Sequence, residues 1–332
     1  MIPGKGECAM KGSEGLKTGF VLTLILCAVL VRWLLSWQVA GSERPEAEEP
    51  VDLRPRLTTL QTPEPTFAPE PELPGDEIFP QIREPIRFTQ EDAQGILIGG
   101  RCSYRTDVSE ALQTSWLGPG RTVLIVHTHG TEAYTPCPGW EYSGSETLRS
   151  EDPDYSVVRV GRALTQALEA QGITVIHDET MHDRLSFSGA YSASAQAVQK
   201  LLEAHPDVGM ILDLHRDAAL NPDGSEFAAT LRSGGTEYAR LMLVVGTDQG
   251  GLYHPDWRMN LGCAAQLQAL LNRSLPGLCR DLDLRTERFN QNLSPGSILI
   301  EVGAAGNTLP QAIASMQPLA EAIAALLTQP DD

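Results

Sequence analysis

Two kinds of hydrophobic pattern alternate along the chain from about residue 90 onward. Short continuous runs of β-branched and aliphatic residues, such as Val123 to Val126 and Val208 to Leu214, are typical of buried strands. Between these runs, apolar residues recur at helical spacing, as in the segment that starts at Val157 and stops at Gly172, a favourable helix end. This alternation predicts an α/β domain with a mostly parallel sheet flanked by helices.

The same patterns give approximate bounds for the remaining elements. We expect further strands at 173–176, 241–245 and 297–302. We expect further helices at 190–204, 257–271 and 310–327. The sequence contains no internal repeat, so it predicts one folded domain of catalytic size rather than an array of repeats.

A longer apolar stretch lies near the N-terminus. The stretch from Gly19 to Ala40 has about 22 residues, enough at 1.5 Å per residue to cross a hydrocarbon core of about 30 Å. Because the lysines precede it, the positive-inside rule places residues 1–18 in the cytoplasm and the rest on the extracytoplasmic side of the cell membrane. We therefore predict a single-pass anchor over 19–40. A cleaved signal peptide is the alternative, although no convincing small-x-small site precedes Ala40.

The segment after this stretch has a different composition. Residues 41–80 contain nine prolines, ten acidic residues and three arginines, a mixture too polar and too interrupted to fold alone. We predict a disordered, acidic, Pro-rich tether over 41–85, followed by the catalytic domain over 86–332. The alternative is an arm that packs on the domain through Ile78, Phe79 and Ile82.

Charge and cysteine content exclude several classes of protein. The 332 residues include 43 acidic and 25 basic side chains, a net charge of -18, which repels phosphate backbones and argues against nucleic-acid binding through a broad basic face. Six scattered cysteines without a CxxC pair are typical neither of a disulfide scaffold nor of a zinc knuckle. Whether Cys102 and Cys137 pair outside the membrane stays open.

Polar residues gather where three predicted strands end or are interrupted. The run His127 to Glu132 follows the first strand, Asp213 to Asp217 closes the strand at 208–214, and Glu301 interrupts the apolar run at 297–302. In open α/β sheets, functional groups collect just beyond the carboxyl ends of the strands. We therefore expect these groups to meet at one edge of the sheet.

The residue types at this edge are those of a catalytic zinc site. His129 and Glu132, three residues apart in a turn, can reach one ion, and His215 can supply a third ligand. Two histidines and one carboxylate leave the fourth position for water. Glu301 is the candidate to accept the proton from that water. The pattern predicts one Zn²⁺ per domain and a hydrolase that acts on amide bonds.

Neighbouring residues suggest supporting roles. Strand alternation points the side chain of His127 away from that of Thr128, so that its ring nitrogen can orient a ligand. Arg216 and Asp217 are expected to form an ion pair that braces the His215 loop.

Four blocks together resemble the stage II sporulation protein P family. They are the segment 127–134, the segment 181–194, DLHRD at 213–217, and NQNLSPGSILIEVGAAGN at 290–307. The resemblance covers about residues 120–328, and the DLHRD and SPGSILIEVG blocks are far more specific than HxxE. The order of an anchor, a Pro-rich tether and then the domain is also similar to that family's layout.

The resemblance implies a fold, an activity and partners. The fold is that of the zinc-dependent N-acetylmuramoyl-L-alanine amidases, which are zinc-carboxypeptidase-like. The activity is cleavage of the amide between N-acetylmuramic acid and L-alanine in peptidoglycan, with a possible endopeptidase activity, during engulfment in endospore formation. The implied partners, besides peptidoglycan, are stage II sporulation proteins D and M.

The resemblance also assigns individual residues. It places the zinc-binding histidines on His129 and His215 and the catalytic glutamate on Glu301. Glu132 is preferred as the carboxylate ligand for its HxxE spacing, with Asp154 in reserve. Trp140 or Tyr142, in a loop over 135–151, is a candidate to stack on sugar, and Arg216 or Asn290 is a candidate oxyanion donor.

Two other functions stay open. The domain can be a catalytically inactive, membrane-tethered scaffold that binds peptidoglycan and recruits other hydrolases, although a decayed site would not need a complete ligand set together with Glu301. A serine hydrolase triad using His127 and Asp213 is a weaker alternative, because no G-x-S-x-G elbow precedes a helix.

Overall fold

The computed structural model describes residues 85–116, 118, 120–143 and 147–328. The predicted anchor and almost all of the predicted tether lie outside these residues. Within them, no helix combines the length and the apolar character needed to cross a membrane.

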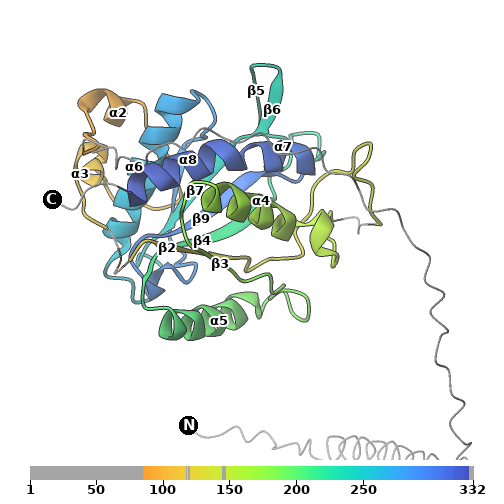
Figure 1. Ribbon diagram of the computed structural model, residues 1–332, viewed down its shortest axis with the longest axis horizontal. Coiled ribbons are helices and arrows are strands. Elements are labelled where there is room, and N and C mark those ends of the chain that lie inside the picture. The colour runs from red at the N-terminus through yellow and green to blue at the C-terminus, as the bar shows by residue number, and fades with distance from the viewer. Residues whose placement is uncertain (1–84, 117, 119, 144–146, 329–332) are drawn as a thin grey trace, which may run out of the picture. The chain divides into compact units, whose positions relative to one another are not determined.

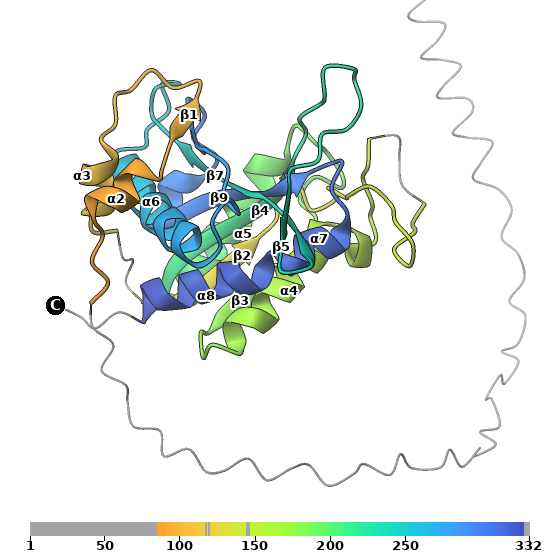
Figure 2. The same cartoon turned by 90° about the horizontal axis from the view of Figure 1, so that it is seen from above.

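A seven-stranded sheet runs through the centre of the domain (Figures 1 and 2). Its strands are β1 (Ile98–Gly100), β2 (Thr122–Val126), β3 (Val175–His177), β4 (Val208–Asp217), β7 (Leu241–Gly246), β8 (Leu282–Arg285) and β9 (Ser297–Ala304). Their spatial order is β1-β8-β7-β9-β4-β2-β3, and every neighbouring pair is parallel except β7 and β9. The strands β9, β4, β2 and β3 therefore run in one direction and end at the same edge.

Helices cover the two faces of this sheet unequally. The longer helices are α4 (Val157–Glu169), α5 (Ala190–Ala204), α6 (Trp257–Ser274) and α8 (Met316–Leu327). The short ones are α2 (Gln90–Gln94), α3 (Val108–Leu112), η1 (Pro153–Tyr155), η2 (Gln291–Leu293) and α7 (Leu309–Ala314). Figure 1 shows α4, α7 and α8 on one face and α5 on the other. The main core lies under α4, α6 and α8, and a smaller apolar cluster lies under α5.

Part of the α5 face remains open to solvent. Strand pairing puts His215, Glu301 and Met242 in one row across this face, because His215 pairs with Glu301 and Glu301 pairs with Met242. Glu301 is the single partly exposed position of β9, and Met242 is the single partly exposed position of β7. The open face thus begins where the predicted chemistry lies.

The predicted mostly parallel α/β fold is confirmed, and several details differ. Strand β3 begins at Val175 rather than at residue 173. The helix predicted at 310–327 is two helices, α7 and α8, with a break at Ser315. Pro318 explains the break, since proline has no N–H to donate to the carbonyl of Ala314. The strands β1 and β8 and the hairpin of β5 (Thr230–Ser233) and β6 (Thr236–Ala239) were not predicted.

Candidate metal centre

Three of the four residues predicted for zinc chemistry lie within contact distance of one another. Strand β2 ends opposite Asp213, and the turn that follows it carries His129 and Glu132 over the edge of the sheet. The Oε2 atom of Glu132 lies 3.2 Å from Nδ1 of His215, and the rings of His129 and His215 meet edge to face with centroids 5.3 Å apart. Glu301 is the strand neighbour of His215. His129, Glu132 and His215 are all buried.

The imidazole of His215 lies between two carboxylates. Its Nδ1 faces Glu132, and its Nε2 lies 3.0 Å from Oδ1 of Asp213. Burial disfavours the charged ring, but Asp213 and then Glu132 outweigh it and hold the pKa of His215 well above its usual value. Burial and the neighbouring His215 lower the pKa of His129, which is therefore a neutral imidazole at pH 7. His129 thus has the protonation state of a metal ligand, whereas His215 carries a proton that a metal has to displace.

Glu301 combines a buried oxygen with access from the open face. Its Oε2 has no hydrogen-bond partner among the described residues. Burial raises the pKa of Glu301 to about 8. The charge of His215 partly opposes this shift, and the charge of Glu132 adds to it. A carboxyl group that exchanges its proton near neutral pH has the property of a general base or acid.

An acid that the sequence interpretation left without a role holds the His129 turn in place. Asp183 accepts hydrogen bonds from the backbone N–H of Thr131 at 3.1 Å, from the Thr131 hydroxyl at 2.5 Å and from Nη1 of Arg149 at 2.7 Å. Arg149 also lies 3.7 Å from Oε1 of Glu132. The only sequence signal for this brace was the 181–194 block of the family resemblance.

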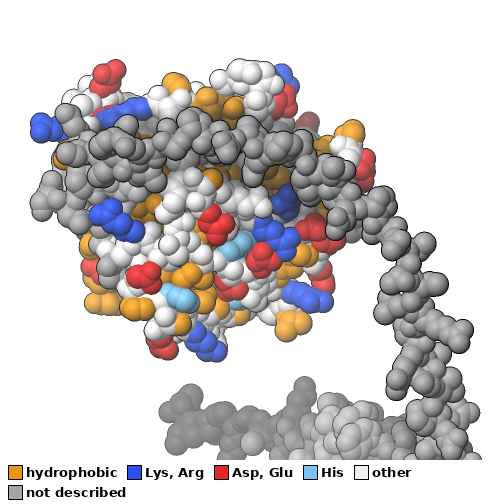
Figure 3. Space-filling view, in the orientation of Figure 1, with side chains coloured by type: hydrophobic (Ala, Val, Ile, Leu, Met, Phe, Trp, Pro, Cys, Tyr) orange, Lys and Arg blue, Asp and Glu red, His pale blue; other side chains and the backbone are white. Residues whose placement is uncertain are grey.

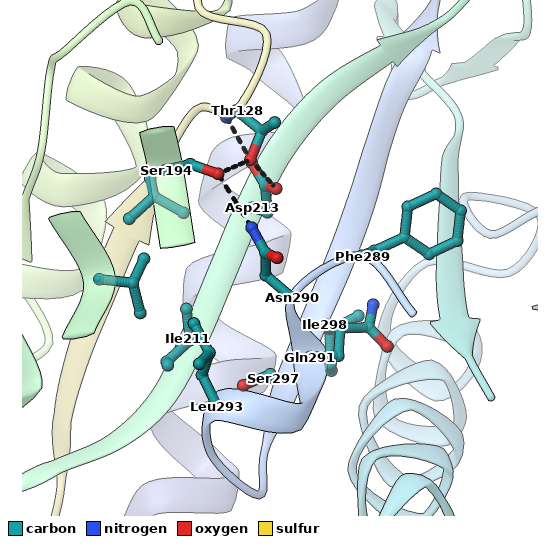
Figure 4. Close-up of a pocket in the computed structure, with 12 residues that line it drawn as sticks. Thr128, Ser194, Ile211, Asp213, Phe289, Asn290, Gln291, Leu293, Ser297 and Ile298 are labelled. Atoms are coloured by element: carbon teal, nitrogen blue, oxygen red, sulfur yellow. Dashed lines mark hydrogen bonds between the residues drawn. The ribbon is translucent and has the colours of Figure 1, made fainter. Parts of the chain in front are cut away.

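A second network supports Asp213 from beneath. The backbone N–H and the hydroxyl of Thr128 donate to its two carboxylate oxygens at 2.8 and 2.7 Å, and the Thr128 hydroxyl lies 2.8 Å from that of Ser194. Asn290 points into this network and donates to Ser194 at 3.0 Å, as Figure 4 shows. The backbone of Asn290 has a left-handed conformation, with a φ of 58°. Asn290, one of the two candidate oxyanion donors, therefore donates its side-chain hydrogen bonds to the residues around Asp213.

The predicted ion pair between Arg216 and Asp217 is wrong. Asp217 pairs instead with Nη1 of Arg280 at 2.8 Å. The guanidinium of Arg216 donates to the backbone carbonyls of Ala133, Thr147 and Leu148. Consecutive strand residues point to opposite faces, so neighbours on β4 cannot pair with each other. Arg216 thus braces the backbone at Ala133 and at 147–148. Its backbone N–H donates to Glu132 at 3.2 Å, and its charge helps to lower the pKa of Glu132.

His127 has its hydrogen bonds on the α4 side of the sheet. Its Nδ1 lies 3.2 Å from the carbonyl oxygen of Leu214, and its Nε2 lies 2.8 Å from Nε2 of His177. There is room for this pair because Gly161 of α4 lacks a side chain: a Cβ there would meet both rings at 2.5 Å. None of these hydrogen bonds joins His127 to His129, Glu132 or His215.

Other sequence candidates also have partners away from the site. Asp154, the reserve ligand, is exposed and pairs with Arg162 at 2.6 Å. Trp140 packs against the main core. The hydroxyl of Tyr142 donates to the carbonyl of Tyr134, and its ring stacks on Tyr155. Cys102 and Cys137 are both free thiols.

The donor set fits a zinc ion. Within the described ranges, no three His, Cys, Asp or Glu side chains already enclose a metal position. The buried Nδ1 of His129 nevertheless has no hydrogen-bond partner among the described residues. The 3.2 Å between His215 Nδ1 and Glu132 Oε2 is also close to the edge of a ligand tetrahedron, roughly 3.3 Å for bonds of about 2.0 Å. Asp213 is then placed to hold the far nitrogen of the His215 ring.

Acidic, basic and histidine side chains are interspersed on the face of the domain shown in Figure 3. The visible described surface therefore has no large patch of one sign.

Comparison with known proteins gives a sequence relative and several structural neighbours. Stage II sporulation protein P of Bacillus subtilis (strain 168) is 30% identical over 210 residues, which are 58% of this chain and 47% of that protein. The chain thus spans about half the length of this curated relative.

The structural neighbours are more distant. The CwlD amidase from Clostridioides difficile, solved in complex with the GerS lipoprotein, is 15% identical over 61% of this chain and 94% of its own, with a TM-score of 0.38. An N-acetylmuramoyl-L-alanine amidase from Clostridium difficile 630 is 15% identical over 64% of this chain and 97% of its own, with a TM-score of 0.37.

A family model provides the broader match. The model of stage II sporulation protein P (SpoIIP) matches residues 85–324, which include His129, Glu132, His215 and Glu301. This match covers well over half of the chain and nearly all of the described domain. The chain therefore belongs to the stage II sporulation protein P family.

Proposed function

We propose that this chain is a zinc-dependent peptidoglycan hydrolase that cleaves the amide between N-acetylmuramic acid and L-alanine during engulfment in endospore formation. The observation that carries the proposal is the placement of Glu301 beside His215, with Glu132 in contact with that histidine and His129 against its ring. Family membership supports the sporulation context. An endopeptidase activity on peptide cross-links is a second reaction that we propose for the same site.

Each residue of the site has a separate task. His129, Glu132 and His215 would hold the ion, and Asp213 would keep the His215 ring in orientation. A bound zinc ion supplies a Lewis acid that polarises a carbonyl and lowers the pKa of water toward about 7. Glu301 accepts a proton at its carboxylate and later returns it to the leaving amine. The Arg149–Asp183 pair keeps the turn with His129 and Glu132 in place.

The chemical identity of the products tests the proposal. Cleavage at this amide releases peptides with a free N-terminal L-alanine and leaves the sugar chain intact. Mass spectrometry of the products that the purified chain releases from muropeptides of known structure detects this alanine. Intact muropeptides after prolonged incubation would instead favour a scaffold that binds peptidoglycan without cleaving it.

The proposal extends to location and partners. The predicted anchor would hold the domain on the extracytoplasmic side of the cell membrane, where peptidoglycan lies, and stage II sporulation proteins D and M would be its partners. In intact cells, a membrane-impermeant thiol reagent should then react with Cys137, a partly exposed thiol, and spare Cys8. Labelling of Cys8 alone would contradict this topology and indicate the opposite orientation in the membrane.

Zinc affinity should depend on pH because zinc and a proton compete for His215. Asp213 and Glu132 hold the pKa of this ring well above its usual value, so the ring is protonated below that raised pKa. Displacement of one proton makes the affinity rise about tenfold per pH unit. Calorimetric titrations with zinc between pH 6 and 8, in buffers of different ionisation enthalpy, measure the proton release. An affinity that stays constant over this range, with no proton released, would contradict the role of His215.

A further inference from the structure

The segment 178–189, here called the Phe187 loop, is fixed against the turn that carries His129. Asp183 of this loop accepts three hydrogen bonds from Thr131 and Arg149. Gly130 touches the loop so closely that a Cβ there would lie 2.8 Å from the Cα of Met181. These contacts fix the position of the Phe187 loop relative to the site. They therefore also fix which of its side chains face solvent beside the site.

Phe187 places an apolar ring directly on the candidate metal centre. Its ring stacks on that of His129 with centroids 4.4 Å apart and planes 9° from parallel. The guanidinium carbon of Arg149 lies 4.8 Å from the centroid of the Phe187 ring. Even with these two contacts, Phe187 is 60% exposed. An apolar surface that bound against this exposed ring would remove it from water.

The chemistry on the two sides of the proposed scissile amide decides which side meets Phe187. On the peptide side, L-alanine presents only a methyl group. On the glycan side, the pyranose ring of N-acetylmuramic acid presents a neutral, flat face of C–H groups, which suits the face of an aromatic ring. The two aromatic residues that the sequence favours for this task are engaged elsewhere: Trp140 packs on the core, and Tyr142 stacks on Tyr155.

We propose that Phe187 is a specificity-determining residue that stacks on the saccharide ring on the glycan side of the scissile amide, beyond the lactoyl group that carries the amide. This inference rests on the proposed function and adds to it a recognition element for the sugar. The contact contributes to binding on the glycan side of the amide, whereas proton transfer stays with Glu301. Phe187 therefore separates substrates that carry a sugar from substrates that contain the same amide without one.

The test compares two substrates that share the same amide. One is an N-acetylmuramoyl peptide, and the other is the matching lactoyl peptide, which lacks the sugar ring. In the full chain, Phe187→Ala should lower kcat/KM for the muramoyl peptide about three- to tenfold, mainly through KM, and leave the lactoyl peptide unaffected. Phe187→Trp should restore the preference for the sugar. Leu185→Ala, at a residue of the same loop that is 97% exposed, is the matched control and should change neither rate.

Bound zinc is measured in every variant, because it distinguishes sugar recognition from support of His129. An equal loss on both substrates together with a loss of zinc would mean that Phe187 only supports His129, and this would overturn the inference. Unchanged rates on both substrates in Phe187→Ala would also overturn it, while the proposed function stands. If the wild-type chain cleaves neither substrate, the proposed function and the inference fall together.

Discussion

Replacement of Glu301 with glutamine is expected to reduce hydrolysis by about 10²- to 10⁴-fold while the domain keeps its zinc. Glutamine preserves the size of the side chain but cannot accept the proton. The fold should tolerate the change well, because burial already raises the pKa of Glu301 to about 8 and a neutral side chain suits this position. A cation held by His129 and His215 would lower that pKa toward neutrality, where a general base works best.

Two measurements on the same preparation separate this role from a structural one. The rate of peptide release reports on proton transfer, and the zinc content reports on the ligand set. Glu321→Gln is the matched control, since it makes the same chemical change on α8, away from the site. If Glu301→Gln released stem peptides at the wild-type rate, Glu301 would have no part in proton transfer.

Replacement of His215 with alanine should remove both zinc and activity. Two ligands, His129 and Glu132, would remain, too few for a stable site. The change also leaves Asp213 and Glu132 buried without the imidazole between them, and breaking a buried ion pair in this way costs about 3–5 kcal/mol. We therefore expect an unfolding midpoint well below that of the wild type, measured in urea, together with loss of stoichiometric zinc.

A second variant separates loss of metal from loss of stability. Among the described residues, the Nδ1 of His129 makes no hydrogen bond, and its nearest acidic oxygen is Oδ2 of Asp183 at 3.8 Å, so His129→Ala should lose zinc at a smaller cost in stability. His205→Ala, at the C-terminal end of α5, controls for removal of a histidine elsewhere. Stoichiometric zinc in either site variant would remove that histidine from the ligand set.

Much of the fold follows from continuous apolar runs. Strands β4 and β9 are buried along almost their whole length, and such runs stand out in the sequence. The strands β1 and β8, with three and four residues, are too short to show a pattern. The break before α8 also depends on one local rule, the missing N–H of Pro318, which helical spacing alone does not show.

Within the site, residues in or at the end of strands could be predicted from the sequence, whereas residues and partners in loops could not. His215 and Glu301 could be predicted because each is a polar residue in or at the end of an apolar strand, and the register then places them side by side. The partner of Asp217 could not, since Arg280 lies 63 residues away in the sequence. Phe187 belongs to a loop without periodicity, so only the fold reveals that it stacks on His129.

The central claim is that this chain hydrolyses the amide next to N-acetylmuramic acid with zinc held at His129, Glu132 and His215. The most direct test is mass spectrometry of products from muropeptides of known structure, with the purified chain, the chain treated with a chelator, and the treated chain after zinc is restored. We predict peptides with a free N-terminal L-alanine in the first and third samples and intact muropeptides in the second. The same products at the same rate in all three samples would contradict the claim.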